Sequence, residues 1–289
     1  MNTVKNAVLL FSKPPVPGMV KTRLTRERGG NLTPEEAAEF FKRSLLDVAD
    51  LVMVALDDLD GINASERAAN PEAPVRTYDF YVSTTPASSV EKMQAVFAEE
   101  DCWPRAVHVI CDKGASFDDH FDDAFQQLFA LGYRNVLSVG GDMPTLPREH
   151  VVDGFLWLDR LASQSADGSA IVLAPCQQSG VSVVGLTATT PLNNQGIYYN
   201  LTGAPALDGY TLKLQEVDVP SAYLTPVSDV DGDNDLAHAI SCLGAIAEAT
   251  RYQPGIYLAR RVLEWIDHRG LVATAPPNDE HDPRTYIDL

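Results

Sequence analysis

Short apolar runs alternate along this chain with stretches in which apolar residues recur every three or four positions. The first run, 4–12, predicts a buried strand because it ends at a proline-rich breaker cluster, 13–18. A helix is predicted next, since Thr33-Pro34-Glu35-Glu36 is a capping box with proline at the first helical position. The chain is therefore expected to begin with a strand, a loop and a helix.

The same alternation continues towards the end of the chain. Further strands are expected at 51–56, 75–83, 106–111, 135–139, 170–174, 181–186 and 212–217. Helices are expected at 88–99, 117–131, 150–161, 236–249 and 255–269. Residues 57–74 are typical of a surface insertion, 177–180 of a turn, and 276–289 of a poorly ordered tail. Strands that alternate with helices predict an α/β fold with a mostly parallel, mixed sheet and helices on both faces.

This pattern favours one main domain at 1–250, followed by a C-terminal helix and flexible tail at 251–289. The hydrophobic content of 45% suits a globular core, and no stretch reaches the roughly 18 apolar residues of a membrane span. The four cysteines (Cys102, Cys111, Cys176 and Cys242) form no CxxC pair, which argues against a zinc or thioredoxin-like site. Free thiols and the lack of a cleavable leader pattern favour a cytoplasmic protein.

The charge of the chain is strongly acidic but unevenly placed. A formal net charge of −18 argues against binding to nucleic acid or to anionic membranes. Residues 1–30 nevertheless carry six basic side chains and one acidic one. A basic island in an acidic protein indicates a local anion-binding site.

The most informative segment is the loop after the first strand, 11–24. Ligands of open α/β sheets bind at the carboxyl ends of the strands, where this loop is expected. Ser12 and Lys13 open the loop, Gly18 permits close approach of the backbone to a ligand, and Lys21 and Arg23 supply charge for phosphate. The loop is neither a Walker A motif nor GxGxxG. The alternative interpretation is a proline-rich connector whose basic residues are solvated.

Two acidic segments are candidate metal sites. Asp142 follows the strand at 135–139 directly, and Mg²⁺ prefers one or two carboxylates together with phosphate oxygens. The alternative for Asp142 is a cap on the next helix. The second segment, 229–235, is not an EF-hand because its twelfth position is Ile240 instead of glutamate. In it, Asp231 is the leading ligand candidate, and the alternative is a solvated turn in which Asp233 caps the following helix.

Other acidic groups are expected to be structural. Asp57-Asp58-Leu59-Asp60 is similar to the DxD of metal-dependent sugar transferases, but it leads into the apparent insertion and favours a solvated turn. Asp118 and Asp119 open a predicted helix, where acidic side chains complement the helix dipole.

Three blocks together resemble a known family. FSKPPVPGMVKTRL at 11–24, GGDMP at 140–144 and SDVDGDNDL at 228–236 match, in order, the motifs of the DUF2064 family. That family is glycosyltransferase-like and belongs to the nucleotide-diphospho-sugar transferase (GT-A) superfamily. Guanylyltransferases of molybdenum cofactor and of coenzyme F420 synthesis are more distant relatives. The resemblance extends from about residue 6 to residue 236.

The resemblance implies a single Rossmann-like GT-A domain that binds a nucleoside diphosphate group. Gly18, Lys21 and Arg23 would lie at the phosphates. Asp142, helped by Asp231, would hold Mg²⁺ or Mn²⁺. Lys21, Arg23 and Asp142 would then be catalytic, because the metal and the loop cations neutralise the leaving diphosphate. The chain departs from the family pattern at 174–185, where a GPxxDGGYYLIG stretch is usual, and at 113–120, where a GDLGERL-like run is usual.

Three functions follow from these expectations. The first is glycosyl transfer from a nucleotide sugar to an unknown small-molecule acceptor. The second is a nucleotidylyltransferase reaction, in which a nucleoside triphosphate reacts with a phosphorylated small molecule and pyrophosphate is released. The third is nucleotide binding without catalysis, which the altered 174–185 segment favours.

Overall fold

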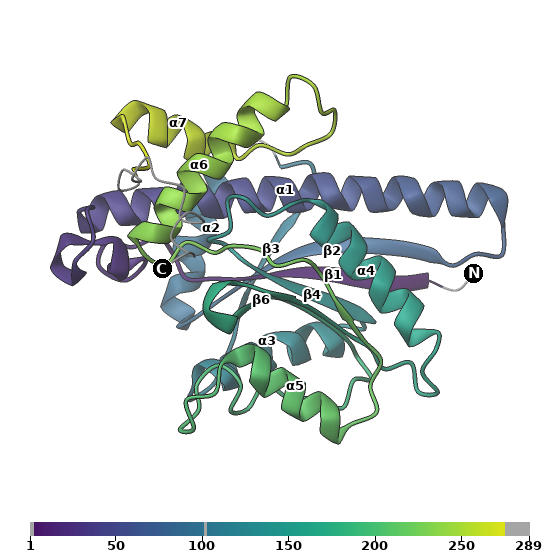
Figure 1. Cartoon of the computed structure of the whole chain (residues 1–289). Coiled ribbons are helices and arrows are strands. Elements are labelled where there is room, and N and C mark those ends of the chain that lie inside the picture. Colours follow the sequence, from purple (N-terminus) through teal and green to yellow (C-terminus); the bar gives the residue numbers. More distant parts are fainter. Residues whose placement is uncertain (1–2, 101–102, 275–289) are drawn as a thin grey trace, which may run out of the picture.

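The computed structural model describes residues 3–100 and 103–274 as one mixed sheet enclosed by helices (Figure 1). The strands are β1 (Thr3–Phe11), β2 (Val75–Thr84), β3 (Val107–Cys111), β4 (Asn135–Gly140), β5 (Ile171–Pro175), β6 (Val181–Thr187) and β7 (Ser221–Tyr223). Their order in the sheet is β3-β2-β1-β4-β6-β5-β7. Among these strands β6 alone runs antiparallel to its neighbours. The expected α/β class with a mostly parallel, mixed sheet is confirmed.

Helices cover both faces of this sheet. They are α1 (Pro34–Ala69), α2 (Val90–Ala98), α3 (Phe117–Ala130), α4 (Glu149–Ala162), α5 (Ala206–Glu216), α6 (Asp233–Ala249) and α7 (Arg260–Arg269). Strand β1 shows how the two layers are specified: Val8 and Leu10 pack with α1, α2 and α4, whereas Ala7 and Leu9 pack with α3 and α5. Alternate residues of a strand point to opposite faces, so a continuous apolar run is buried on both sides.

The C-terminal helices lie outside α1, on the side away from the sheet (Figure 1). Trp265 and Val262 of α7 and Leu236 and Leu243 of α6 form one apolar cluster with Phe40 of α1. The N-terminal part of α1 is therefore covered by α6 and α7 on the side away from the sheet.

Two predicted strands are wrong. Residues 51–56 continue α1, which extends over 36 residues, and the region expected as an insertion from 57 is also helical as far as Ala69. Leu51, Met53 and Leu56 are buried while Val54 is 39% exposed, so the helix buries an apolar run almost all round. The second error is 212–217, which lies largely in α5, where Tyr210 is buried and Leu212 is exposed. Short apolar runs do not distinguish a strand from a buried helix.

Most other predicted elements are confirmed within a few residues. The capping box of Thr33 and Glu36 begins α1 as expected. The helix expected at 255–269 begins only at Arg260, and β7 was not anticipated. The tail expected at 276–289 lies outside the described residues. Within the described part of the chain, no helix has both the length and the apolar character needed to cross a membrane.

Candidate functional site

The strand order creates a crevice at one edge of the sheet. From β1 the chain proceeds outward to β2 and β3, and it then returns to pair β4 with the other side of β1. In register, Phe11 of β1 lies beside Ser83 of β2 and Gly140 of β4. Open α/β sheets bind ligands where the strand order reverses in this way, outside the carboxyl ends of the strands. The loops after β1 and β4 meet there.

The loop after β1 folds back over this crevice. Two short backbone hydrogen bonds tighten it, from Val16 N to the Pro14 carbonyl (2.8 Å) and from Met19 N to the Val16 carbonyl (3.0 Å). Gly18 adopts a φ of 75°, which glycine accepts without strain. Lys21 also has a left-handed backbone, with a φ of 47°, and it stands immediately before the 3₁₀ turn Thr22–Leu24. This turn directs the Lys21 side chain inward, where only 8% of it is exposed.

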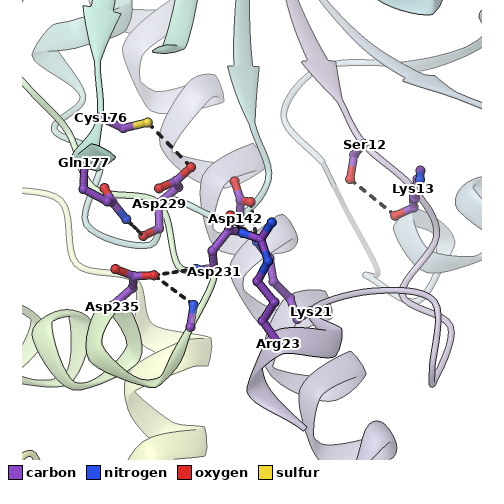
Figure 2. Close-up of polar contacts among 11 residues, drawn as sticks. Ser12, Lys13, Lys21, Arg23, Asp142, Cys176, Gln177, Asp229, Asp231 and Asp235 are labelled. Atoms are coloured by element: carbon purple, nitrogen blue, oxygen red, sulfur yellow. Dashed lines mark hydrogen bonds and ion pairs between the residues drawn. The ribbon is translucent and has the colours of Figure 1, made fainter. Parts of the chain in front are cut away.

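The Lys21 ammonium lies between two carboxylates that are remote in sequence. Its Nζ is 2.5 Å from Asp142 Oδ2 and 2.8 Å from Asp231 Oδ1, as Figure 2 shows. Burial favours the neutral amine, but the two carboxylates outweigh burial and raise the pKa of Lys21 above its usual value. Lys21 is therefore a fixed positive charge at the carboxyl ends of the neighbouring strands β1 and β4.

Arg23 extends the positive charge outward. Its Nη1 donates to Asp231 Oδ2 at 3.0 Å, and 73% of its side chain is exposed. Burial opposes ionisation of Asp231, yet Lys21 and Arg23 together hold the pKa of that carboxyl below its usual value. The exposed guanidinium can turn towards a ligand without losing packing.

Two glycines make room for Asp142. A Cβ at Gly140 would stand 2.7 Å from Asp142 Oδ1, and a Cβ at Gly141 would stand 2.6 Å from Leu45 Cδ1 of α1. Real Cβ atoms do not approach so closely, so a side chain at either position would displace the Asp142 carboxylate or Leu45. The backbone N–H of Val230 donates to the Asp142 carbonyl at 3.0 Å, which joins the second acidic loop to the first.

The loop at 229–232 is held by the first turn of α6. Asp235 Oδ2 accepts from the backbone N–H groups of Asp231 (3.1 Å) and Gly232 (2.8 Å). The expectation that Asp233 caps this helix is wrong, because Gly232 is the N-cap residue and Asp235 makes the capping contacts. Asp233 instead accepts from Asn31.

Asp229 is a third carboxylate at this site and belongs to the candidate segment 229–235, in which Asp231 was the leading ligand candidate. Burial, together with the charges of Asp142 and Asp231, raises the pKa of Asp229 to about 6. Its neighbours come from the turn after β5: Gln177 Nε2 donates to its backbone carbonyl at 2.5 Å, and the Cys176 thiol lies 3.8 Å from Oδ2 (Figure 2). The site is therefore richer in negative charge than Lys21 and Arg23 can balance.

Two cavities flank Asp142. One, of about 390 Å³, is bordered by the three carboxylates (Asp142, Asp229 and Asp231), by aromatic rings and by residues of the 174–185 segment. The other, of about 490 Å³, is bordered by the β1 loop, the ends of β2 and β3 and the start of α3. Phe117 and Tyr199 line both cavities and lie 5.6 Å apart between ring centroids.

Most of the predicted site residues converge on these cavities. Ser12, Lys13 and Lys21 line the larger cavity, Asp231 lines the smaller one, and Asp142 lines both. Gly18 and Arg23 line neither. The two segments that depart from the family pattern also border the site, 174–185 at the smaller cavity and 113–120 at the larger one.

The other acidic groups have structural roles. Asp57 and Asp60 lie on α1 and both contact Arg105, so the solvated turn expected there is wrong. Asp119 completes a capping box with Ser116 at the start of α3, which confirms the expected contribution to the helix N-terminus. The sequence did not point to the aromatic pair Phe117 and Tyr199, or to Asp112 and His120, which both line the larger cavity. The position of Asp112 directly after β3 was the available signal.

Comparisons with solved structures place this chain among proteins of related fold. A proposed nucleotide-diphospho-sugar transferase from Desulfovibrio desulfuricans G20 is 19% identical, with a TM-score of 0.63 over 91% of this chain and 95% of that chain. A cytidylyltransferase from Leptospira borgpetersenii is 12% identical, with a TM-score of 0.46 over 96% of this chain and all of that chain. 4-diphosphocytidyl-2C-methyl-D-erythritol synthase from Anaerococcus prevotii is 10% identical, with a TM-score of 0.44 over 84% of this chain and 96% of that chain.

In the comparison of sequences, the model of one family matches part of the chain. No curated protein matches the chain. The model of the family described as "Uncharacterized protein conserved in bacteria (DUF2064)" matches residues 75–200, which include Asp142 and both altered segments. The match supports the resemblance to DUF2064 over these residues, and the Desulfovibrio protein shares the Rossmann-like α/β fold.

Proposed function

We propose that this protein is a metal-dependent transferase that moves a glycosyl group from a nucleotide sugar to a small-molecule acceptor. The observation that carries the proposal is the position of Lys21, whose ammonium joins Asp142 to Asp231 between two cavities at the reversal of strand order. A site with fixed charges of both signs at this edge suits a phosphate-bearing ligand with a cation. The fold of the Desulfovibrio protein is compatible with this role.

The two cavities differ in the charge of the residues that line them, and we use this difference to assign parts of the substrate to each cavity. Lys13 and Lys21 line the larger cavity, whereas none of the described residues that line the smaller one is lysine or arginine. We therefore assign the nucleoside diphosphate to the larger cavity, with its phosphates at Lys21. The transferred group and the acceptor would occupy the smaller cavity across Asp142.

The residues present fit a divalent cation. Asp142 and Asp231 converge on one cationic position, which the Lys21 ammonium takes in this structure, and Asp229 adds uncompensated negative charge. Within 3–100 and 103–274, no group of three or more histidine, cysteine or acidic side chains is arranged to hold a metal ion. An ion held by Asp142 and Asp231 would need phosphate oxygens as well, which is the ligand set that Mg²⁺ prefers.

The chemistry of the chain's own residues follows from their charge. When the bond between the sugar and the diphosphate breaks, negative charge develops on the departing diphosphate. The fixed ammonium of Lys21 and the exposed guanidinium of Arg23 stabilise that charge. The bound metal ion would add Lewis-acid stabilisation of the same oxygens.

The charge of the smaller cavity favours glycosyl transfer over the nucleotidylyltransferase reaction. A phosphorylated acceptor would have to enter beside Asp142, Asp229 and Asp231. None of the described residues that line this cavity is lysine or arginine, and Lys21 and Arg23 contact only Asp142 and Asp231 from outside it. Like charges in a partly dehydrated site repel each other strongly. An acceptor without phosphate meets no such penalty.

A thermal-shift screen of the whole protein tests the proposal. The ligands are nucleotide sugars and nucleoside triphosphates, each with and without Mg²⁺ or Mn²⁺. A ligand at 100 times its Kd stabilises the folded state by about 2.7 kcal/mol, which corresponds to a Tm increase of roughly 5 °C. We expect a metal-dependent shift with a nucleotide sugar, and release of the nucleoside diphosphate on turnover.

Other results have distinct meanings. A shift with a triphosphate alone, followed by pyrophosphate release, would favour the nucleotidylyltransferase. Binding of a nucleotide sugar without turnover in the presence of candidate acceptors would favour a nucleotide-binding protein. The absence of a shift with every nucleotide would refute the proposed function.

A further inference from the structure

A buried acidic side chain lies at the far end of the larger cavity. Asp112 follows β3 directly, and only 1% of its side chain is exposed. The Ser83 hydroxyl, at the end of β2, donates to Asp112 Oδ2 at 2.6 Å. Asp112 Oδ1 is 2.7 Å from Nδ1 of His120, which lies in the first turn of α3. Three separate elements thus converge on one carboxylate.

The Asp112–His120 contact leaves one imidazole nitrogen for another partner. Asp112 Oδ1 and His120 Nδ1 are buried and lie 2.7 Å apart, and within the described residues neither has a partner with hydrogen-bond geometry. A buried carboxylate is costly unless a positive or proton-bearing group faces it, so this close approach favours the tautomer that carries its proton on Nδ1. The other nitrogen, Nε2, lies on the opposite side of the ring, and His120 lines the larger cavity.

The position of the pair in the sheet indicates which part of a nucleotide it would meet. Strand β3 is two strands away from β1, and neighbouring strands are about 4.8 Å apart, so Asp112 lies roughly 10 Å from the end of β1. The phosphates of the nucleotide are assigned to Lys21, at the carboxyl ends of β1 and β4. A ribose and its base span the remaining distance, so the nucleoside would reach the end of β3.

We propose that His120 is a specificity-determining residue that contacts the nucleoside moiety through Nε2, with Asp112 and Ser83 as its positioning residues. This inference rests on the proposed function, because it requires a nucleotide in the larger cavity. His120 belongs to the 113–120 segment, in which the chain departs from the usual family pattern. In this proposal, a residue of the altered segment, His120, takes part in the selection of the nucleoside.

Binding measurements on His120→Ala test the contact. The probes are the diphosphates of adenosine, guanosine, cytidine and uridine, and inorganic pyrophosphate, each titrated with Mg²⁺. We expect about tenfold weaker binding of the preferred nucleoside diphosphate, a smaller difference among the four bases and unchanged binding of pyrophosphate. His120→Gln, which can place an amide near the position of Nε2, should recover part of the loss.

A matched control separates this effect from the loss of any histidine. His108 lies on β3, is exposed and stacks on Tyr81 at 4.8 Å between ring centroids. His108→Ala should leave every affinity unchanged. Equal losses of nucleoside diphosphate and pyrophosphate in His120→Ala would overturn the proposal, and so would no loss at all. If the wild-type protein binds none of the nucleotides, the proposed function itself fails, and this inference fails with it.

The positioning role of Asp112 has a spectroscopic signature. In ¹⁵N spectra of the histidine side chains, we expect His120 to carry its proton on Nδ1 in the wild-type protein. Asp112→Asn should remove this preference and weaken nucleoside diphosphate binding as His120→Ala does. Ser83→Ala leaves the carboxylate in place and should give a smaller change in the same direction. An unchanged His120 tautomer in a folded Asp112→Asn protein would contradict the positioning role.

Discussion

Arg261→Met would remove the counter-ion of a buried carboxylate between α1 and α7. Asp47 has a side chain that is 1% exposed, and it accepts from Arg261 Nη1 at 3.0 Å and from the backbone N–H of Val262 at 2.9 Å. Loss of one partner of a buried pair costs about 3–5 kcal/mol. Asp50 and Glu100, which also contact Arg261, are about one third exposed and add little. Because Asp47 keeps its backbone donor, we expect a loss of about 3 kcal/mol.

The same reasoning gives the pH dependence of this loss. Burial raises the pKa of Asp47 from 3.8 to about 6, so the folded state favours its protonated form, and this contribution to stability disappears as pH rises through 6. Without Arg261 the pKa of Asp47 should rise further. The deficit of the variant should therefore be largest at pH 8 and become smaller towards pH 5.

Urea unfolding of both proteins at pH 5, 6, 7 and 8 measures this difference directly. Arg260→Met is the control, because Arg260 is exposed and adjacent in sequence. It should change the free energy of unfolding by less than about 0.5 kcal/mol. A deficit for Arg261→Met below about 1 kcal/mol, or one that stays constant from pH 5 to 8, would refute the assignment of a buried, charge-dependent contact.

Three further predictions concern the candidate site. Asp142→Asn should abolish the metal-dependent part of nucleotide binding. It should also lower Tm modestly, because the buried Lys21 ammonium loses one carboxylate partner and keeps Asp231. Unchanged Mg²⁺ dependence in titrations would exclude Asp142 as a ligand. Arg23→Ala should weaken the binding of nucleoside diphosphates by about tenfold and the binding of nucleosides hardly at all. Equal weakening of the binding of both would indicate a structural arginine. Gly140→Ala should displace the Asp142 side chain and lower the metal-dependent affinity for nucleotides, because the added Cβ would stand 2.7 Å from Asp142 Oδ1. An affinity equal to that of the wild-type protein would show that the loop adjusts at no cost.

Local signals in the sequence anticipated much of the fold. The capping box at Thr33, the strand β4 that ends before Gly141, and the capped start of α3 all depend on residues within a few positions of each other. Such features form through short-range hydrogen bonds and side-chain periodicity, which a sequence displays directly.

The two wrong strands illustrate where local signals are insufficient. The run Leu51–Leu56 has the composition of a buried strand, yet α1 continues through it because its apolar residues pack against the sheet, α2 and α4. Whether a short apolar run forms a strand or a fully buried helix turn depends on what packs against it. That information lies in residues such as Leu158 of α4, which shares a core cluster with this run from about 100 positions further along the chain.

The sequence by itself determined the chemistry that is available at the site. It placed Lys13, Lys21 and Arg23 in a loop after one strand and Asp142 after another, and it concentrated acidic residues at 229–235. Each of these placements follows from a strand and the loop after it. The two glycines before Asp142 can be seen in the sequence. The close approach of Leu45 and of the Asp142 carboxylate to these glycines can be seen only in the structure.

Only the tertiary structure decided which of these groups meet. Lys21 contacts Asp142 and Asp231 across 121 and 210 positions, and Asp112 joins Ser83 and His120 from three elements. These contacts depend on strand order and register, which set the residues that share one edge of the sheet. Hydrophobic periodicity specifies the faces of a strand but not its neighbours, so the same local pattern is compatible with several orders. The order β3-β2-β1-β4 is what gathers the phosphate loop, the carboxylates and the Asp112–His120 pair around two cavities.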